Sequence, residues 1–204
     1  MSEVTKIILI RHGQTEWNLI GRWQGFADIP LNETGQAQAE ALQTRLAAWQ
    51  IDAFVSSDLK RANETAVIAA KPHNLTVKTD PIWRERDVGD FSGLNRQQVK
   101  EKFPEIWGKA INGILEPPNG EQYQDLQKRA LNALRSVIDS NAGSIVAVVT
   151  HGQLIHVLLA QIMGIEQGKY GRFSMRGNTG ISIIENLKDN PIVTRLNDTA
   201  HLDY

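Results

Sequence analysis

Residues 7–10 are four consecutive aliphatic side chains, Ile-Ile-Leu-Ile, and the polar triplet Arg11-His12-Gly13 follows them at once. An apolar run without polar alternation is typical of a strand buried on both faces, as in the parallel sheet of an α/β protein. In open sheets of this class, ligands bind in the crevice outside the carboxyl ends of the strands. The run therefore favours an α/β fold and predicts a binding site beside His12.

A second predicted strand ends in the same way. Residues 144–150 read SIVAVVT, and His151-Gly152 comes next. The helix expected after them would begin at Gly152 and Gln153, whose backbone N–H groups and helix dipole suit phosphate oxygens. A single histidine of this kind is more often structural, but two strands that each end in His-Gly indicate a site in which His12 and His151 meet. The other histidines are interpreted as structural: His73, His156 and His201.

A third polar segment follows another short apolar run. Residues 53–55, Ala-Phe-Val, predict a strand, and the string SSDLKRANETAVIAA then leads into a helix. We expect Ser56 or Ser57 to cap that helix, which leaves Arg61 on its first turn and at the same sheet edge as His12. An arginine near a helix start is usually solvated, but this one would share an edge with the histidine.

Composition sets limits on size and partners. With 204 residues, of which 41% are hydrophobic and 22% charged, the chain suits one well-buried core, so we expect a single domain over residues 1–204. The formal net charge of −1, without a run of lysine and arginine, argues against a nucleic acid or a membrane surface as partner. The lack of cysteine excludes disulfides, thiolate metal sites and cysteine nucleophiles.

Nothing near the N-terminus indicates export or membrane insertion. The string MSEVTK contains an acidic residue, and the apolar run behind it is short. We therefore expect no signal peptide and no membrane span, and the cytoplasm is the expected location.

The rest of the pattern predicts helices, one excursion and a hairpin. Apolar residues at helical spacing predict a helix capped by Asn32 and further helices over residues 95–111 and 123–139. Between the last two, the string EPPNG breaks the pattern, and we interpret residues 94–122 as a lid-like insertion over the site. The C-terminal strings GISIIE and IVTRLN predict a β-hairpin at the sheet edge.

Taken together, these strings resemble a known family. RHG with TEWN, the string SSDLKRANETA, an ExxxG pattern from Glu85 to Gly89, and the second HG occur in the order typical of the histidine phosphatase superfamily, the phosphoglycerate-mutase-like enzymes. The resemblance covers nearly the whole chain and implies a three-layer α/β/α sandwich with a mostly parallel central sheet. The chain departs from the family pattern at Ser92, where many relatives carry Glu or Gln.

The resemblance also implies roles for particular residues. His12 would be the nucleophile and Glu85 the proton donor, while Arg11, Arg61 and His151 would balance the charge of the phosphoryl group. Composition alone would make the Glu85 segment an ordinary charged surface loop. The residues implied to bind the substrate are Thr15, Asn18, Gln24, Gly25, Gly152 and Gln153.

Charge explains how such a site would act. A bound phosphoryl group brings about two negative charges, which two guanidinium groups and an imidazole would balance without a metal ion or other cofactor. Neighbouring arginines lower the pKa of an imidazole from about 6.5, so His12 would be ready to form a phosphohistidine. We also expect the substrate dianion to repel the carboxylate of Glu85, which would then take up a proton.

Three alternatives accompany the expected function, a phosphatase acting on small phosphate esters. A phosphoglycerate mutase must hold a carboxylate and a second phosphate group, yet the excursion has no arginine pair. An inactive phosphoester-binding module is disfavoured because all the implied site residues are present. No HExxH, HxH or Asp-rich string indicates a metal phosphatase. The cations of the excursion are Arg96, Lys100, Lys102 and Lys109.

Two questions stay open at the level of sequence. The residue pattern allows a homodimer but does not require one. The aromatic residues near the excursion suggest a site that accepts varied organic groups, if they face it: Phe91, Trp107 and Tyr123.

Overall fold

The computed structural model describes residues 4–109, 114–166, 173–175, 177–187 and 190–202. Within them lies a six-stranded sheet made of β1 (Thr5–Arg11), β2 (Ala53–Ser56), β3 (Val77–Thr79), β4 (Ile145–Thr150), β5 (Ile181–Leu187) and β6 (Asn190–Asp198). The strand order is β3-β2-β4-β1-β5-β6, and the first four strands in this order pair in parallel. β5 runs antiparallel to β1 and β6 antiparallel to β5, which confirms the mostly parallel sheet and the edge hairpin.

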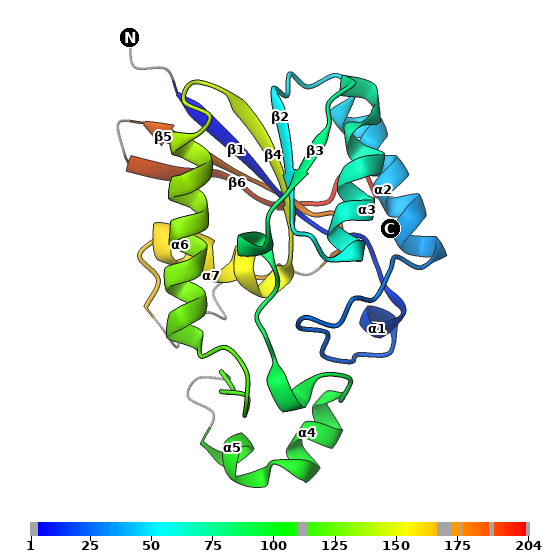
Figure 1. Cartoon of the computed structure of the whole chain (residues 1–204), viewed down its shortest axis with the longest axis vertical. Helices are drawn as coiled ribbons and strands as arrows, with labels where there is room; N and C mark the ends of the chain where they lie inside the picture. Colours follow the sequence, from blue (N-terminus) through cyan, green and yellow to red (C-terminus); the bar gives the residue numbers. More distant parts are fainter. Residues whose placement is uncertain (1–3, 110–113, 167–172, 176, 188–189, 203–204) are drawn as a thin grey trace.

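Helices cover both faces of this sheet (Figure 1). α2 (Glu33–Leu46) and α3 (Lys60–Ala70) pack on one face, and α6 (Tyr123–Asp139) and α7 (Gly152–Ile162) on the other. The predicted three-layer α/β/α sandwich is confirmed. None of the described helices has the length and apolarity that crossing a bilayer requires. The shorter helices are α1 (Glu16–Leu19), α4 (Arg96–Lys102), α5 (Pro104–Gly108), η1 (Lys71–His73), η2 (Pro81–Trp83) and η3 (Gly89–Phe91).

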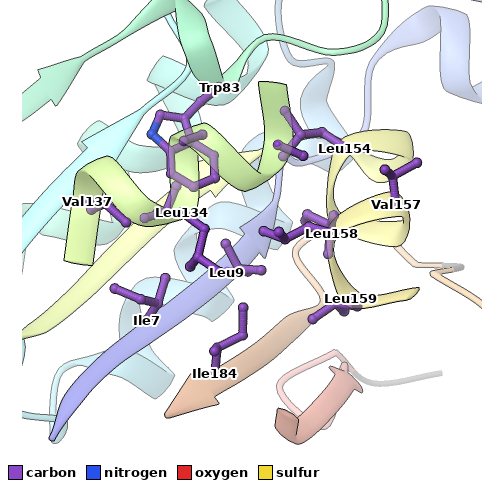
Figure 2. Packing of buried hydrophobic residues seen from close by; sticks show 14 of the residues in the cluster. Ile7, Leu9, Trp83, Leu134, Val137, Leu154, Val157, Leu158, Leu159 and Ile184 are labelled. Atoms are coloured by element: carbon purple, nitrogen blue, oxygen red, sulfur yellow. The ribbon is translucent and has the colours of Figure 1, made fainter. Parts of the chain in front are cut away.

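The central strand β1 explains the unbroken aliphatic run. Because successive side chains of a strand point to opposite faces, Ile7 and Leu9 enter the cluster formed with α6 and α7, as Figure 2 shows. Ile8 and Ile10 enter the other cluster, formed with α2 and α3. All four side chains are at most 1% exposed, as predicted for a strand with no polar face.

The helix predictions are correct except in the excursion. Oδ1 of Asn32 accepts the N–H of Gly35 at 2.9 Å and caps α2 as predicted, and α6 has the predicted bounds. The single helix predicted over residues 95–111 is wrong, because the chain divides into α4 and α5 at Phe103. Pro104 has no N–H to continue α4 but suits the first turn of α5. Residues 110 and 111 lie outside the described residues.

The predicted cap of α3 is also wrong. α3 begins after Leu59, which makes no capping hydrogen bond with its side chain. The hydroxyl of Ser56 donates to the carbonyl of Ser57, and the hydroxyl of Ser57 is hydrogen-bonded to His151. The N–H of Lys60 is donated instead to Oδ1 of Asp28, at 2.7 Å. A loop far away in the sequence therefore satisfies the first turn of α3, which local patterns do not reveal.

Candidate active site

β1 and β4 lie side by side and end at the same level. Their register pairs Arg11 with Thr150, so the next residues, His12 and His151, leave the sheet together. The centroids of the two imidazole rings are 5.1 Å apart, and the ring planes are inclined by 59°. The fold thus brings together two histidines that are far apart in the sequence.

A cavity of about 480 Å³ opens at this edge of the sheet. Of the predicted site residues, Thr15 and His151 do not line it, and both are fully buried. The others do: Arg11, His12, Asn18, Gln24, Gly25, Arg61, Glu85, Gly152 and Gln153.

His12 is 2% exposed, and one backbone carbonyl orients its ring. Nδ1 lies 2.6 Å from the carbonyl oxygen of Gly13. Because a carbonyl can only accept, Nδ1 carries the ring proton and Nε2 the lone pair. Burial is the largest cause that lowers the pKa of His12 well below 6.5, and the charges of Arg61 and Arg11 lower it further. The ring is therefore neutral at pH 7.

His151 is fully buried, and a serine orients its ring. Nε2 lies 2.9 Å from Oγ of Ser57. That Oγ also accepts the N–H of Leu59 at 3.3 Å, and its own proton has no acceptor other than Nε2 among the described residues, so we assign the ring proton of His151 to Nδ1. Nδ1 is buried without a hydrogen-bond partner among the described residues. Burial, and then the charge of Arg61, lower the pKa of His151 well below 6.5, so His151 is a neutral donor rather than a cation.

Arg11 and Arg61 place two guanidinium groups beside the cavity. Nη1 and Nη2 of Arg61 donate to the carbonyls of Ala27 and Gly25 at 2.8 and 2.9 Å, and Nη1 of Arg11 donates to that of Met175 at 3.1 Å. In both arginines the Nε–H is buried without a partner in the described part of the chain. Burial lowers the pKa of Arg61 to about 10 and lowers that of Arg11, so both remain charged at pH 7. Cations whose N–H donors are buried and unused suit a phosphate group.

Glu85 lies at the N-terminus of α7. Its Oε2 accepts the N–H of Gln153 and its Oε1 that of Leu154, both at 3.3 Å, and Oε1 also accepts the N–H of Arg86 at 3.0 Å. A carboxylate is favoured at this position by the helix dipole. In the described arrangement Glu85 occupies the Gln153 amide that the sequence predicts to hold phosphate, so the role of this amide toward a phosphate stays a prediction.

The loop after α1 reaches the site through its backbone. Gly25 has φ +50°, and a Cβ there would lie 2.6 Å from Cγ2 of Val88, so only glycine fits. Its carbonyl holds Arg61, as described above. Oε1 of the neighbouring Gln24 is buried without a partner among the described residues, on the wall of the cavity.

Thr15 acts on the site through Asn18. Its Oγ1 accepts the N–H of Asn18 at 3.2 Å, and Oδ1 of Asn18 accepts the N–H of Thr15 at 3.1 Å, which makes a capping box for α1. Nδ2 of Asn178 donates to the carbonyl of His12 at 3.0 Å and lies 3.4 Å from Oδ1 of Asn18. Thr15 therefore orients Asn18 and does not itself reach the cavity.

His156, which the sequence analysis interprets as structural, faces the site. His156 lines the cavity, and the centroid of its ring lies 4.3 Å from that of Phe173. It follows Gly152 by one helical turn and so shares its face, a signal that the sequence contains. Gly21, Arg22 and Trp23 belong to the loop around Gln24 that the resemblance places at the phosphate, and they line the cavity. The further lining residues are Val88, His156, Phe173, Ser174 and Met175.

The excursion packs beside the cavity rather than into it. Phe91 lies in a small cluster against which Trp107 packs, and Tyr123 belongs to the core under α6. Of the described residues 94–109 and 114–122, none lines the cavity. The aromatic residues named above therefore do not form its wall, and the role of this segment as a lid stays a prediction.

The described residues contain no group of three or more His, Asp or Glu side chains placed to hold a metal ion. The histidines and Glu85 instead pair with a carbonyl, a hydroxyl and backbone amides.

A sequence profile of the histidine phosphatase superfamily (branch 1) matches residues 7–199. The chain belongs to this superfamily. Metal-independent phosphoserine phosphatase from Arabidopsis thaliana is 34% identical over 209 residues, which cover 98% of this chain and 84% of that protein. Probable phosphoglycerate mutase GpmB from Yersinia pestis is also 34% identical, over 97% of this chain and 95% of its own length.

Solved structures give the same result. Bacillus stearothermophilus YhfR superposes with a TM-score of 0.91 at 31% identity, covering 97% of this chain and 98% of that one. Phosphoserine phosphatase from Entamoeba histolytica, in complex with 3-phosphoglyceric acid, gives a TM-score of 0.83 at 30% identity and covers 97% and 98%. The predicted family is confirmed, and with it a phosphatase enzyme whose relatives include mutases.

Proposed function

We propose that this protein is a metal-independent phosphomonoesterase that acts on small phosphorylated metabolites through a phosphohistidine at His12. The observation that carries the proposal is the hydrogen bond from Nδ1 of His12 to the carbonyl of Gly13, at 2.6 Å. It assigns the lone pair to Nε2 on a ring that lines the cavity between two arginines. A neutral imidazole with an oriented lone pair is a nucleophile for phosphorus.

The charge of the phosphoryl group would be balanced by donors that have no other partner. The Nε–H groups of Arg11 and Arg61 and the Nδ1–H of His151 are buried and unpaired in the described part of the chain. In a water-poor site such fixed donors stabilise the charge that develops on the equatorial oxygens. This arrangement needs no metal ion in the reaction step.

Glu85 would act as the proton donor to the leaving group. In the described arrangement its carboxylate accepts two amides of α7 at 3.3 Å, which are long hydrogen bonds that a bound anion can replace. A phosphate dianion beside it would repel the carboxylate and lead it to take up a proton. We therefore expect the acid limb of the pH profile of kcat to differ from that of kcat/KM, and coincident limbs would contradict this step.

Hydrolysis is favoured over phosphoglycerate mutation because few cationic side chains line the cavity among the described residues. Besides Arg11 and Arg61, the lining contains Arg22 as a further arginine and no lysine, among the described residues. A mutase has to hold a carboxylate and a second phosphate group as well. Arg96, the arginine of the excursion, stacks on Trp107 at 4.7 Å and does not line the cavity.

The decisive test is turnover of a panel of phosphomonoesters in excess EDTA. The panel includes phosphoserine, and 3-phosphoglycerate with and without 2,3-bisphosphoglycerate. We expect release of inorganic phosphate that EDTA does not diminish. Isomerisation of 3-phosphoglycerate would favour the mutase, binding without either reaction would favour an inactive phosphoester-binding module, and loss of activity in EDTA would contradict metal independence.

A further inference from the structure

Arg129, on α6, uses its whole guanidinium group in hydrogen bonds. Nε and Nη2 donate to the two carboxylate oxygens of Glu121 at 2.8 and 2.7 Å. Nη1 donates to the carbonyls of Ile82 and Arg84, both at 2.8 Å, and Nη2 also donates to the carbonyl of Glu85 at 3.0 Å. These five contacts engage all five N–H donors that an arginine has.

Three of these contacts fix the segment that carries Glu85. The carbonyls of residues 82, 84 and 85 converge on one side chain, and the carbonyl of Trp83 accepts the hydroxyl of Thr150 at 2.6 Å. Four consecutive carbonyls are therefore tied to α6 or to the end of β4. The side chains of Arg129 and Glu121 are 20% and 15% exposed, so water competes little for these bonds.

The same segment has to hold a carboxylate at one place. The side chain of Glu85 reaches the N-terminus of α7, while its own carbonyl points to Arg129 on α6. A proton donor must lie within hydrogen-bond reach of the leaving oxygen, and a shift of about 1 Å lowers rates by about two orders of magnitude. An apolar residue at position 129 would be enough to pack α6. The hydrogen bonds of the Arg129 guanidinium group therefore indicate that residues 82–85 have to be held in one position.

We propose that Arg129 is a positioning residue for the general acid Glu85, an inference that rests on the proposed function. Arg129 lies outside the cavity lining and acts through the backbone of residues 82–85. The step it supports is transfer of the Glu85 proton to the ester oxygen as the P–O bond breaks and Nε2 of His12 bonds to phosphorus. Formation of the phosphohistidine from an ester that needs no protonation is independent of it.

The test compares esters that differ in their need for an acid. Values of kcat/KM are measured for 2,4-dinitrophenyl, 4-nitrophenyl, phenyl and alkyl phosphates with wild type, Glu85→Gln, Arg129→Met and Arg129→Lys. Arg135→Met, an exposed arginine on the same helix, is the matched control. The readout is the ratio of two esters in one preparation, which does not depend on how much of a variant is folded.

We expect Glu85→Gln to lose about 10²-fold or more on phenyl and alkyl phosphates and only a few-fold on 2,4-dinitrophenyl phosphate. Arg129→Met should show the same selective loss in weaker form. Arg129→Lys keeps the charge but not the fork, so it should resemble the methionine variant. Arg135→Met should keep the wild-type ratio.

Each contrary outcome has a distinct meaning. An equal loss on every ester in Arg129→Met, with a selective loss in Glu85→Gln, would overturn the inference and leave the proposed function standing. Full rescue by lysine would also overturn it, because charge alone would then explain the effect. A uniform profile in Glu85→Gln, or no hydrolysis by the wild type, would contradict the proposed function itself.

Discussion

The ends of β1 and β4 carry the same His-Gly pair on neighbouring parallel strands, yet their imidazoles are held in opposite ways. His12 donates from Nδ1 to a backbone carbonyl and lines the cavity. His151 accepts a hydroxyl proton from Ser57 at Nε2, is fully buried and does not line the cavity. One ring therefore offers a lone pair and the other an N–H. The comparison teaches that the partner of the second ring nitrogen, and not the motif, sets the role of each histidine.

The largest expected effect distinguishes the two rings. His12→Asn retains an amide near the Gly13 carbonyl but no nucleophile, and we expect kcat to fall about 10⁴-fold or more. His151→Gln removes the Nδ1 donor, and we expect a loss of about 10²- to 10³-fold, with His151→Asn less affected because its amide can replace that donor. Steady-state kinetics on one ester measure this order. Equal losses at both positions would break the comparison.

A smaller effect tests what the rings share. Both pKa values are lowered by burial, so at these two positions the unfolded chain binds up to two more protons than the native protein as the pH falls through about 6.5. We expect the free energy of unfolding to decrease by about 2 to 3 kcal/mol from about pH 7.5 to about pH 5.5. Urea denaturation at both pH values measures it.

The pH range of this change differs from that in which Asp198 titrates. Asp198, whose pKa the hydrogen bond from Arg45 lowers to about 2, contributes stability that is lost only below its ordinary value of 3.8. Its window therefore lies well below that of the histidines. Replacing His151 should reduce the change above pH 5 by about 1.4 kcal/mol, and an unchanged free energy over this range would contradict the buried neutral state.

The smallest effect tests whether Ser57 orients the ring of His151. Ser57→Ala removes the hydroxyl that holds Nε2 of His151, and we expect kcat to fall about tenfold with little change in KM. Ser56→Ala is the matched control, because Ser56 is equally buried but donates to a backbone carbonyl. Equal activity of the two variants would show that Ser57 does not orient His151.

Much of the site could be predicted because it lies where strands end. The aliphatic runs before His12 and His151 fix both histidines at one sheet edge, and Arg61 follows from the strand and helix order. The fold class follows from the same runs. The order of the signature strings then added Glu85, which its local composition would have left as a surface charge.

What the sequence could not predict depends on contacts between distant segments. Asp28 accepts the N–H of Lys60 at the start of α3, and Glu85 accepts the N–H of Gln153, which was predicted to bind phosphate. Both carboxylates come from loops that are far away in the sequence. The five bonds of Arg129 likewise join segments that no local period relates. One signal was available, since Arg129 follows the buried Leu126 by three positions on an otherwise apolar helix face.

The central claim is that His12 becomes phosphorylated, and trapping the intermediate tests it most directly. Wild-type protein is mixed with a phosphate-labelled 2,4-dinitrophenyl ester, quenched in alkali during the burst of dinitrophenolate, and mapped by peptide. We predict one labelled peptide, which contains His12 and whose label is lost in acid, and no label in His12→Asn. A burst without label on His12, or with label on another residue, would contradict the account.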